Sequence, residues 1–258
     1  ILKLIEEFKA DTRQGKIDLG VGVYKDPQGV TPVMRAVKAA EQRIWETQTT
    51  KAYTGLAGEP EYRDAMARMV LKDVPGITFG IVAPDGREGM IQNANEFLER
   101  GIPFIFDPGQ AMPLFNGPEL RNFIEQADYV VVNDYESNLL QERTGWDETV
   151  IAGKVKAYIC TRGPKGVVIH ADGTTHDVPP AHERRVTDPT GCGDAFRAGL
   201  IFGIEKGFDW LTIGRIGNLM GALKVEHPGT QNQRFDYAEF SLQFRQQFGY
   251  SLESNTAV

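Results

Sequence analysis

The strongest constraint on the fold of this chain is an alternation of short apolar runs with longer amphipathic segments, which begins near residue 77. The apolar runs predict strands buried on both faces, and the segments between them predict helices. The strands are expected at 77–84, 102–107, 128–133 and 156–161, and the helices at 86–100, 117–127 and 135–145. This alternation predicts an α/β layer, doubly wound, with a mostly parallel sheet and flanking helices.

The pattern changes after residue 165, where residues 166–179 predict a β-hairpin. The Asp172-Gly173 pair in its centre is a strong two-residue turn signal. Three helices are then expected, over 191–207, 209–227 and 236–248. We expect residues 74–258 to form one part of the molecule.

The first 73 residues differ in character. Residues 31–46 predict a helix with Thr31 as N-cap and Pro32 as first helical residue, and residues 59–71 predict a second helix. Two amphipathic helices and an extended arm bury little area against the entropy of ordering them. Residues 1–73 are therefore not expected to form an independent domain, and a junction is expected near residues 71–74.

Charge and cysteine content exclude several function classes. The formal net charge of −7 argues against a surface for nucleic acid or anionic membranes, which needs clustered Lys and Arg. Cys160 and Cys192 have neither CxxC nor Cys/His spacing, so no disulfide framework or zinc site is indicated. No apolar run is long enough to span a bilayer. A cytoplasmic protein without a membrane or nucleic-acid partner is expected.

The stretch TDPTGCGDAF, residues 187–196, has the pattern of an anion site. Gly191 and Gly193 let successive N–H groups point at one spot, and the helix that starts there adds the positive end of its dipole. Asp194 stands beside these donors, where a carboxylate can accept a proton from an attacking hydroxyl. The alternative is an ordinary helix start with Asp in the first turn.

Three motifs together point to a known family. DPTGCGDAFRAG, NDYE at 133–136 and TRGPKG at 161–166 occur in the order and spacing of the ribokinase-like, PfkB-type carbohydrate kinases, and residues 74–258 resemble the bacterial adenosine-kinase-like branch most. Pro189 and Cys192 replace Thr and Ala of many members, which leaves the backbone role intact. The resemblance implies a ribokinase-like fold, in an incomplete form, and use of ATP and Mg²⁺. It also implies that residues 74–258 are the nucleotide-binding and catalytic part.

The resemblance also implies roles for individual residues. Asp194 would be the general base, and the backbone of Gly191, Cys192 and Gly193 would form the anion hole for the γ-phosphoryl group. Glu136 would act on magnesium through water, and Asn133 would support the metal and phosphates. The alternative for this pair is a helix cap, with Asn133 or Asp134 as N-cap and Glu136 in the first turn.

Further residues would face the nucleotide or a second ion. The resemblance places Thr161, Gly163 and Gly166 beside the phosphates or ribose, against the alternative of a plain strand exit that needs glycines. Asp188, with Thr190, would contribute to a monovalent-cation site as in some relatives, although Asp188 is also a common turn-former. Asn218, in the helix expected over 209–227, is a candidate for the adenine edge.

Residues 1–73 resemble a second family. KIDLGVGVYKDPQGVTPVMRAVKAAE and TTKAYTGLAGEPEYRDAM are similar to the N-terminal segment of class I aspartate/aromatic aminotransferases. In that family the glycine matching Gly22 lies near the substrate, and the tyrosine matching Tyr53 reaches pyridoxal phosphate. The Schiff-base lysine and phosphate loop have no counterpart here, so no pyridoxal phosphate is expected.

Three hypotheses follow for the function. The first is an ATP-dependent phosphotransferase acting on a sugar or nucleoside hydroxyl, with adenosine as the nearest acceptor. The second is a nucleotide-binding chimera without turnover, because the half that binds the acceptor in these kinases has no visible counterpart. The third is an aminotransferase-derived protein. Uncovered sheet faces and edges around residues 77–84 would favour self-association.

Overall fold

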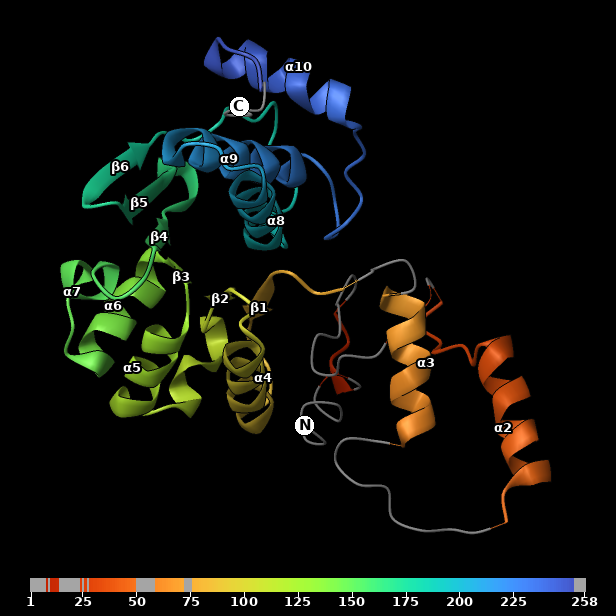
Figure 1. Cartoon of the computed structure of the whole chain (residues 1–258). Coiled ribbons are helices and arrows are strands. Elements are labelled where there is room, and N and C mark those ends of the chain that lie inside the picture. The colour runs from red at the N-terminus through yellow and green to blue at the C-terminus, as the bar shows by residue number, and fades with distance from the viewer. Residues whose placement is uncertain are drawn as a thin grey trace. The chain divides into compact units, whose positions relative to one another are not determined.

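A computed structural model describes residues 8, 10–13, 24, 26, 28–49, 59–71 and 76–252 (Figure 1). The chain divides into two units, Ile1–Asp73 and Val74–Val258, and each is described by itself. Gly22, Tyr53 and most of the expected junction near residues 71–74 lie outside the described residues.

The first unit contains helices α2 (Arg35–Thr47) and α3 (Pro60–Leu71). The predicted cap of α2 is wrong: the N-cap is Met34, and it makes no side-chain cap hydrogen bond. Met34 has an extended backbone (ψ 142°), so the chain from Thr31 onward enters the helix three residues later than its Thr-Pro pair suggests. No residue of α2 is buried.

The second unit is built on a six-stranded sheet with strands in the sequential order β1 to β6. The strands are β1 (Gly80–Val82), β2 (Phe104–Phe106), β3 (Tyr129–Asn133), β4 (Ala157–Thr161), β5 (Val167–Ala171) and β6 (Thr174–Val178). Strands β1 to β4 run parallel, and β5 and β6 are antiparallel to their neighbours. The β5–β6 turn is the predicted one, with positive φ at Asp172 (51°) and Gly173 (69°).

Helices connect the strands and follow the hairpin. Between the strands lie α4 (Arg87–Arg100), α5 (Gly117–Gln126), α6 (Asp134–Thr144) and α7 (Glu148–Ala152), and after the hairpin lie α8 (Cys192–Glu205), α9 (Trp210–Val225) and α10 (Tyr237–Phe248). Two 3₁₀ turns lie at Gly109–Leu114 and Gly163–Lys165. Neither the 3₁₀ turns nor α7 was predicted, because such short segments carry too few residues for a helical period to be seen.

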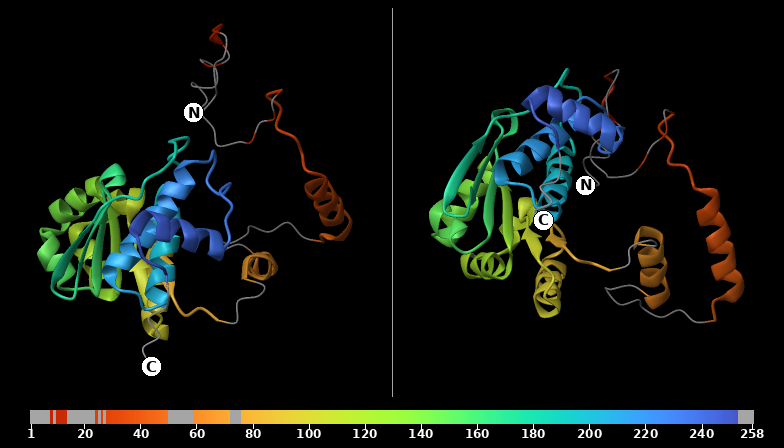
Figure 2. Two further views of the ribbon diagram at one scale, coloured as in Figure 1. Left: turned by 90° about the horizontal axis from the view of Figure 1, so that it is seen from above. Right: turned by 45° about the horizontal axis from the view of Figure 1, so that its top comes forward.

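The two faces of the sheet carry separate cores. Val130 and Val132 of β3 point to the face covered by α4 to α7, whereas Tyr129 and Val131 point to the face covered by α8 and α9. Figures 1 and 2 show the yellow and green helices on one side of the sheet and the blue helices on the other. A third cluster joins α9 to α10. The predicted α/β layer with helices on both faces is confirmed.

The strand order explains which helices cover which face. Right-handed crossovers that advance in one direction put all their helices on one face of a sheet. Because the order β1 to β4 never reverses, α4 to α7 share a face, and the helices after the hairpin cover the other. Helix α8 packs tightly on α9, since a Cβ on Gly199 would lie 3.1 Å from the Cα of Gly217. The N-terminus of α8 is thereby fixed in the second unit.

Candidate functional site

The site is organised by the carboxyl ends of three parallel strands. Asp107 directly follows β2, Asn133 ends β3 and Thr161 ends β4, and Asn133 pairs with Thr161 in the register of the sheet. Open α/β sheets bind ligands outside the carboxyl ends of their strands. The predicted strand-end residues therefore lie at the edge where such a fold places a ligand.

The loop before α8 presents unpaired N–H groups. Gly191 is the N-cap of α8 in the left-handed conformation (φ 84°) with no side-chain cap. The N–H of Cys192 donates to the Pro189 carbonyl at 3.1 Å, so this predicted anion-hole donor is already engaged. Within the described part of the chain, the N–H groups of Gly191, Gly193 and Asp194 make no hydrogen bond. They are free to receive an anion at a helix N-terminus.

Asn133 and Glu136 form a reciprocal capping box at the start of α6. The Asn133 side chain accepts a hydrogen bond from the Glu136 N–H at 2.8 Å, and Glu136 Oε2 accepts one from the Asn133 N–H at 2.9 Å. The cap alternative is thus realised in this structure. Both side chains are only half-buried, and the second carboxylate oxygen of Glu136 has no protein partner among the described residues.

A cavity of about 370 Å³ lies next to the loop. Its walls come from the turn after β4, the segment after β6, the start of α8 and the middle of α9: Thr161, Gly163, Pro164, Gly166, Pro180, Ala181, Glu183, Val186, Pro189, Cys192, Gly193, Phe196, Gly217, Asn218, Gly221, Ala222 and Val225. Mostly apolar side chains and exposed backbone are usual for a small-molecule pocket. Of the predicted residues, this cavity brings together Thr161, Gly163, Gly166, Cys192 and Gly193.

The turn after β4 requires its glycines. Gly166 has φ 85°, and a Cβ there would lie 2.1 Å from the carbonyl oxygen of Val178. Gly163 has φ 53° with open space around it, so glycine is required there only by the left-handed backbone conformation. Asn218 faces the same cavity, and its Nδ2 donates to the Pro179 carbonyl at 2.8 Å. Its Oδ1 is left for a donor group.

An ion pair that was not predicted from the sequence joins the buried Asp107 to the half-buried Arg197 of α8. The guanidinium of Arg197 binds the Asp107 carboxylate through two nitrogens, with Nη2 to Oδ1 at 2.8 Å and Nε to Oδ2 at 2.5 Å. Burial raises the pKa of Asp107 against the Arg197 charge, and the nearby charges of Glu136 and Asp194 raise it further. These three carboxylates therefore converge on one region, although 90 residues separate Asp107 from Arg197.

Asp188 is held by backbone donors. Its carboxylate accepts hydrogen bonds from the N–H groups of Thr190 at 2.9 Å and Gly229 at 2.8 Å. The Thr190 N–H and hydroxyl, then the Gly229 N–H, lower the pKa of Asp188 to about 2. The carboxylate is thus ionised at neutral pH and acts as an anchor between two loops.

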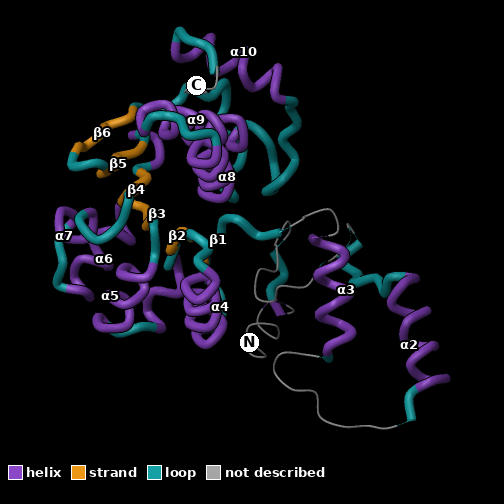
Figure 3. Tube along the Cα trace, in the orientation of Figure 1, coloured by secondary structure: helices purple, strands orange, loops and turns teal. Residues whose placement is uncertain are grey.

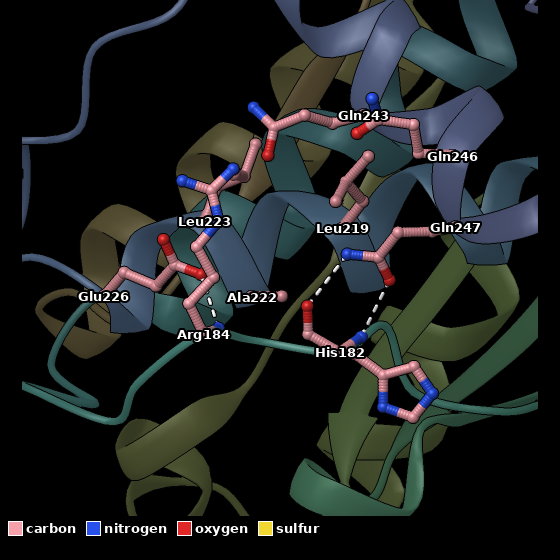
Figure 4. A pocket seen from close by; sticks show the side chains of 9 residues that line it. All are labelled: His182, Arg184, Leu219, Ala222, Leu223, Glu226, Gln243, Gln246 and Gln247. Atoms are coloured by element: carbon pink, nitrogen blue, oxygen red, sulfur yellow. Dashed lines mark hydrogen bonds between the residues drawn. The ribbon is translucent and has the colours of Figure 1, made fainter.

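A second hollow, of about 120 Å³, lies between α9, α10 and residues 182–184 (Figure 4). Three hydrogen bonds lie in it: His182 N–H donates to Gln247 Oε1, Gln247 Nε2 donates to the His182 carbonyl, and the Arg184 N–H donates to Glu226. These hydrogen bonds fasten residues 182–184 to α10 and to the end of α9.

Two observations concern metals and membranes. Across residues 76–252 and the described parts of the first unit, no three His, Cys, Asp or Glu side chains gather as metal ligands. In the same described ranges, no helix has the length and apolar character that crossing a membrane requires.

Comparison with known proteins identifies two sources of similarity. The model of the pfkB family of carbohydrate kinases matches residues 48–235. The structure of Burkholderia thailandensis nucleoside kinase in complex with inosine aligns with a TM-score of 0.67 at 50% identity, over 69% of this chain and 60% of that one. Methanocaldococcus jannaschii nucleoside kinase, a member of the ribokinase family, aligns with a TM-score of 0.63 at 26% identity, over 66% and 56%.

Aminotransferases match as well. The aromatic-amino-acid aminotransferase of Paracoccus denitrificans is 52% identical over 113 residues, which are 42% of this chain and 29% of that enzyme. Both resemblances seen in the sequence are thus confirmed. The chain spans less than two thirds of the length of the relatives named above.

The family model covers well over half of the chain, and the six-stranded sheet with its flanking helices belongs to a fold that aligns with a ribokinase-family structure. The chain belongs to the PfkB family of carbohydrate kinases.

Proposed function

We propose that residues 74–258 bind ATP and transfer its γ-phosphoryl group to a hydroxyl of a nucleoside. The observation that carries this proposal is the placement of three unpaired N–H groups, on Gly191, Gly193 and Asp194, beside an apolar cavity at the carboxyl edge of the sheet. The acceptor class is supported by the two nucleoside kinases among the relatives, one of them with bound inosine. Adenosine is the nearest candidate within this class, and a free sugar is the competing acceptor.

In this proposal, the cavity holds the nucleotide and the loop receives its terminal phosphoryl group. The apolar walls suit a purine, and the Asn218 Oδ1 could accept from its amino group. Gly163 and Gly166 let the turn after β4 approach the phosphates without a side chain in the way. The unpaired N–H groups of the loop and the dipole of α8 then stabilise the charge on the phosphoryl group in transfer.

Asp194 is the proposed general base. Its carboxylate lies in the first turn of α8 and is exposed, so an acceptor hydroxyl can reach it. The hydroxyl oxygen forms the new bond to the γ-phosphorus, its proton passes to Asp194, and the bond between the γ-phosphorus and the β,γ-bridging oxygen breaks with ADP leaving.

The residues present can hold a magnesium ion, because a kinase site needs only one or two protein carboxylates for it. Mg²⁺ in kinase sites is held by one or two carboxylates together with substrate phosphates, and there it neutralises developing charge. Glu136 keeps one carboxylate oxygen free of the capping box, and Asn133 lies at the same strand end. Both are proposed to hold the ion, Glu136 through water.

The remaining expectations are part of the same proposal. Residues 1–73 are proposed to be no domain of their own, which the complete exposure of α2 supports. Self-association through the edge strand β1 and a cytoplasmic location stay predictions. Binding of nucleotide without turnover is the competing function, because the chain covers only 60% of the Burkholderia enzyme.

The test is a coupled ADP-release assay with ATP and Mg²⁺, run with inosine, adenosine, ribose and fructose in turn. Asp194→Asn should lower kcat by about 10²-fold or more, because the proton then lacks an acceptor. Glu142→Gln, which removes an exposed charge from α6, is the matched control and should leave the rate unchanged.

Two outcomes would count against the proposal. A rate for Asp194→Asn within a few-fold of the unmodified chain would remove Asp194 from the role of base. ATP-dependent thermal stabilisation with no acceptor-dependent ADP release would favour the competing function, a nucleotide site without turnover.

A further inference from the structure

Lys224 near the end of α9 is a fully buried charge. Its side chain has no solvent exposure, and its Nζ donates to the carbonyl oxygens of Asp188 at 2.6 Å and His227 at 3.2 Å. In the described part of the chain it forms no ion pair within 4.0 Å. Burying an ammonium group is costly unless hydrogen bonds and nearby opposite charge compensate. The cost of burying this ammonium group indicates that Lys224 has a specific role.

The two carbonyls belong to loops that meet at the anion site. The Asp188 loop runs directly into Gly191 and the start of α8, and the His227 loop follows α9. Both loops are tied again by the Asp188 carboxylate, which accepts from Gly229. The contact extends to the anion site, since a Cβ on Gly191 would lie 3.2 Å from the Cβ of Thr230.

The atoms around the ammonium are of the kind that bind a monovalent cation such as K⁺. Backbone carbonyl oxygens coordinate K⁺ in proteins. Here the Asp188 and His227 carbonyls already bind Nζ, and the Asp188 carboxylate faces the N–H groups of Thr190 and Gly229. The residues present therefore do not fit the monovalent cation expected at Asp188, because its place among the carbonyls is taken.

We propose that the ammonium of Lys224 is a resident cation, a positioning group that fixes residues 187–191 against the loop after α9 and makes a bound monovalent ion unnecessary. The catalytic consequence rests on the proposed phosphotransfer, since the loop that Lys224 holds carries the unpaired N–H groups. The structural consequence does not depend on the proposed phosphotransfer: the second unit folds, and residues 187–191 stay in place, without K⁺.

The experiment compares the unmodified chain, Lys224→Ala and Lys224→Met in K⁺, NH₄⁺ or tetramethylammonium at one ionic strength. Thermal unfolding midpoints and kcat are both recorded. Lys206→Ala, which removes an exposed lysine after α8, is the control. Alanine vacates the space of the side chain, whereas methionine fills most of it without a charge.

The unmodified chain should have the same midpoint and rate in all three salts. Lys224→Ala should have a lower midpoint and a kcat lowered on the order of 10²-fold through misplacement of the loop. K⁺ or NH₄⁺, but not tetramethylammonium, should restore part of both losses. Lys224→Met should show the losses without restoration, because no ion can enter.

Specific activation or stabilisation of the unmodified chain by K⁺ would overturn the proposal, even if both variants fail to fold. A Lys224→Met protein with the midpoint of the unmodified chain would overturn it as well. If no phosphotransfer is detected in any salt, the proposed function fails, and the midpoints alone still decide the role of Lys224.

Discussion

The two units of this chain contain helices of similar length but use them differently. Helix α2 in the first unit has 13 residues and none buried, whereas α8 in the second has 14 and buries Phe196 and Leu200 against the sheet. Figure 3 shows helices but no strand among the described residues before β1. An apolar stripe lets a helix form, but a partner surface is what makes it part of a core.

Replacing one large aromatic side chain in each unit should give the largest difference between the units in lost unfolding free energy. Phe106 in β2 is fully buried and stacks on Phe123 with ring centroids 4.7 Å apart. Phe106→Ala should lower the free energy of unfolding by about 3–5 kcal/mol, because it leaves a cavity in the core. Trp45→Ala in α2, where the side chain is 88% exposed, should change it by less than about 0.5 kcal/mol.

Urea denaturation followed by circular dichroism at 222 nm measures both. Equal losses of unfolding free energy in the two variants would contradict this comparison, since Trp45 is exposed and packs into no core among the described residues. A loss below about 1 kcal/mol for Phe106→Ala would mean that the β2 face is not packed as described.

Alanine substitutions at two glycines, one in each unit, extend the comparison with smaller expected losses of stability. Gly166 and Gly29 both have positive φ, of 85° and 78°. Alanine at either site incurs about 1–2 kcal/mol for the left-handed backbone. At Gly166 it also meets the Val178 carbonyl, which adds about 1–3 kcal/mol for overpacking, whereas nothing lies within 4 Å at Gly29.

Gly166→Ala should therefore lower the unfolding midpoint of the second unit and weaken ATP binding measured by calorimetry. Gly29→Ala should leave both unchanged, because Gly29 belongs to the other unit and is not among the residues that line this cavity. Undisturbed ATP binding in Gly166→Ala would argue that the nucleotide does not use the cavity beside the turn after β4.

Much of the second unit could be predicted because its patterns are local. Apolar runs located β1 to β4, and the Asp172-Gly173 pair located the hairpin of β5 and β6. The cap of α2 was misplaced because Thr31 and Pro32 carry a strong local signal that the extended residues before Arg35 override. Segments as short as α7 have no periodicity to detect.

The parts of the site made of contiguous residues could be predicted from the sequence. The contacts between residues far apart in the sequence could not. The loop at Gly191–Asp194 and the strand-end Asn133 were named from contiguous residues. Asp107 could have been noticed as an acid directly after a buried strand, but its pairing with Arg197 depends on the fold. Lys224 looks like an ordinary exposed lysine at a helix end, and only packing reveals its burial.

The most direct test of the account is amide hydrogen exchange on the whole chain, read by mass spectrometry for peptides from α2 and α9. Amides in α9 should be protected to the level of global unfolding, about 5–15 kcal/mol. Those of α2 should exchange within about tenfold of an unstructured peptide, because an isolated helix of this length is marginal in water. Protection of α2 equal to that of α9 would contradict the claim that α2, unlike the helices of the second unit, packs into no core among the described residues.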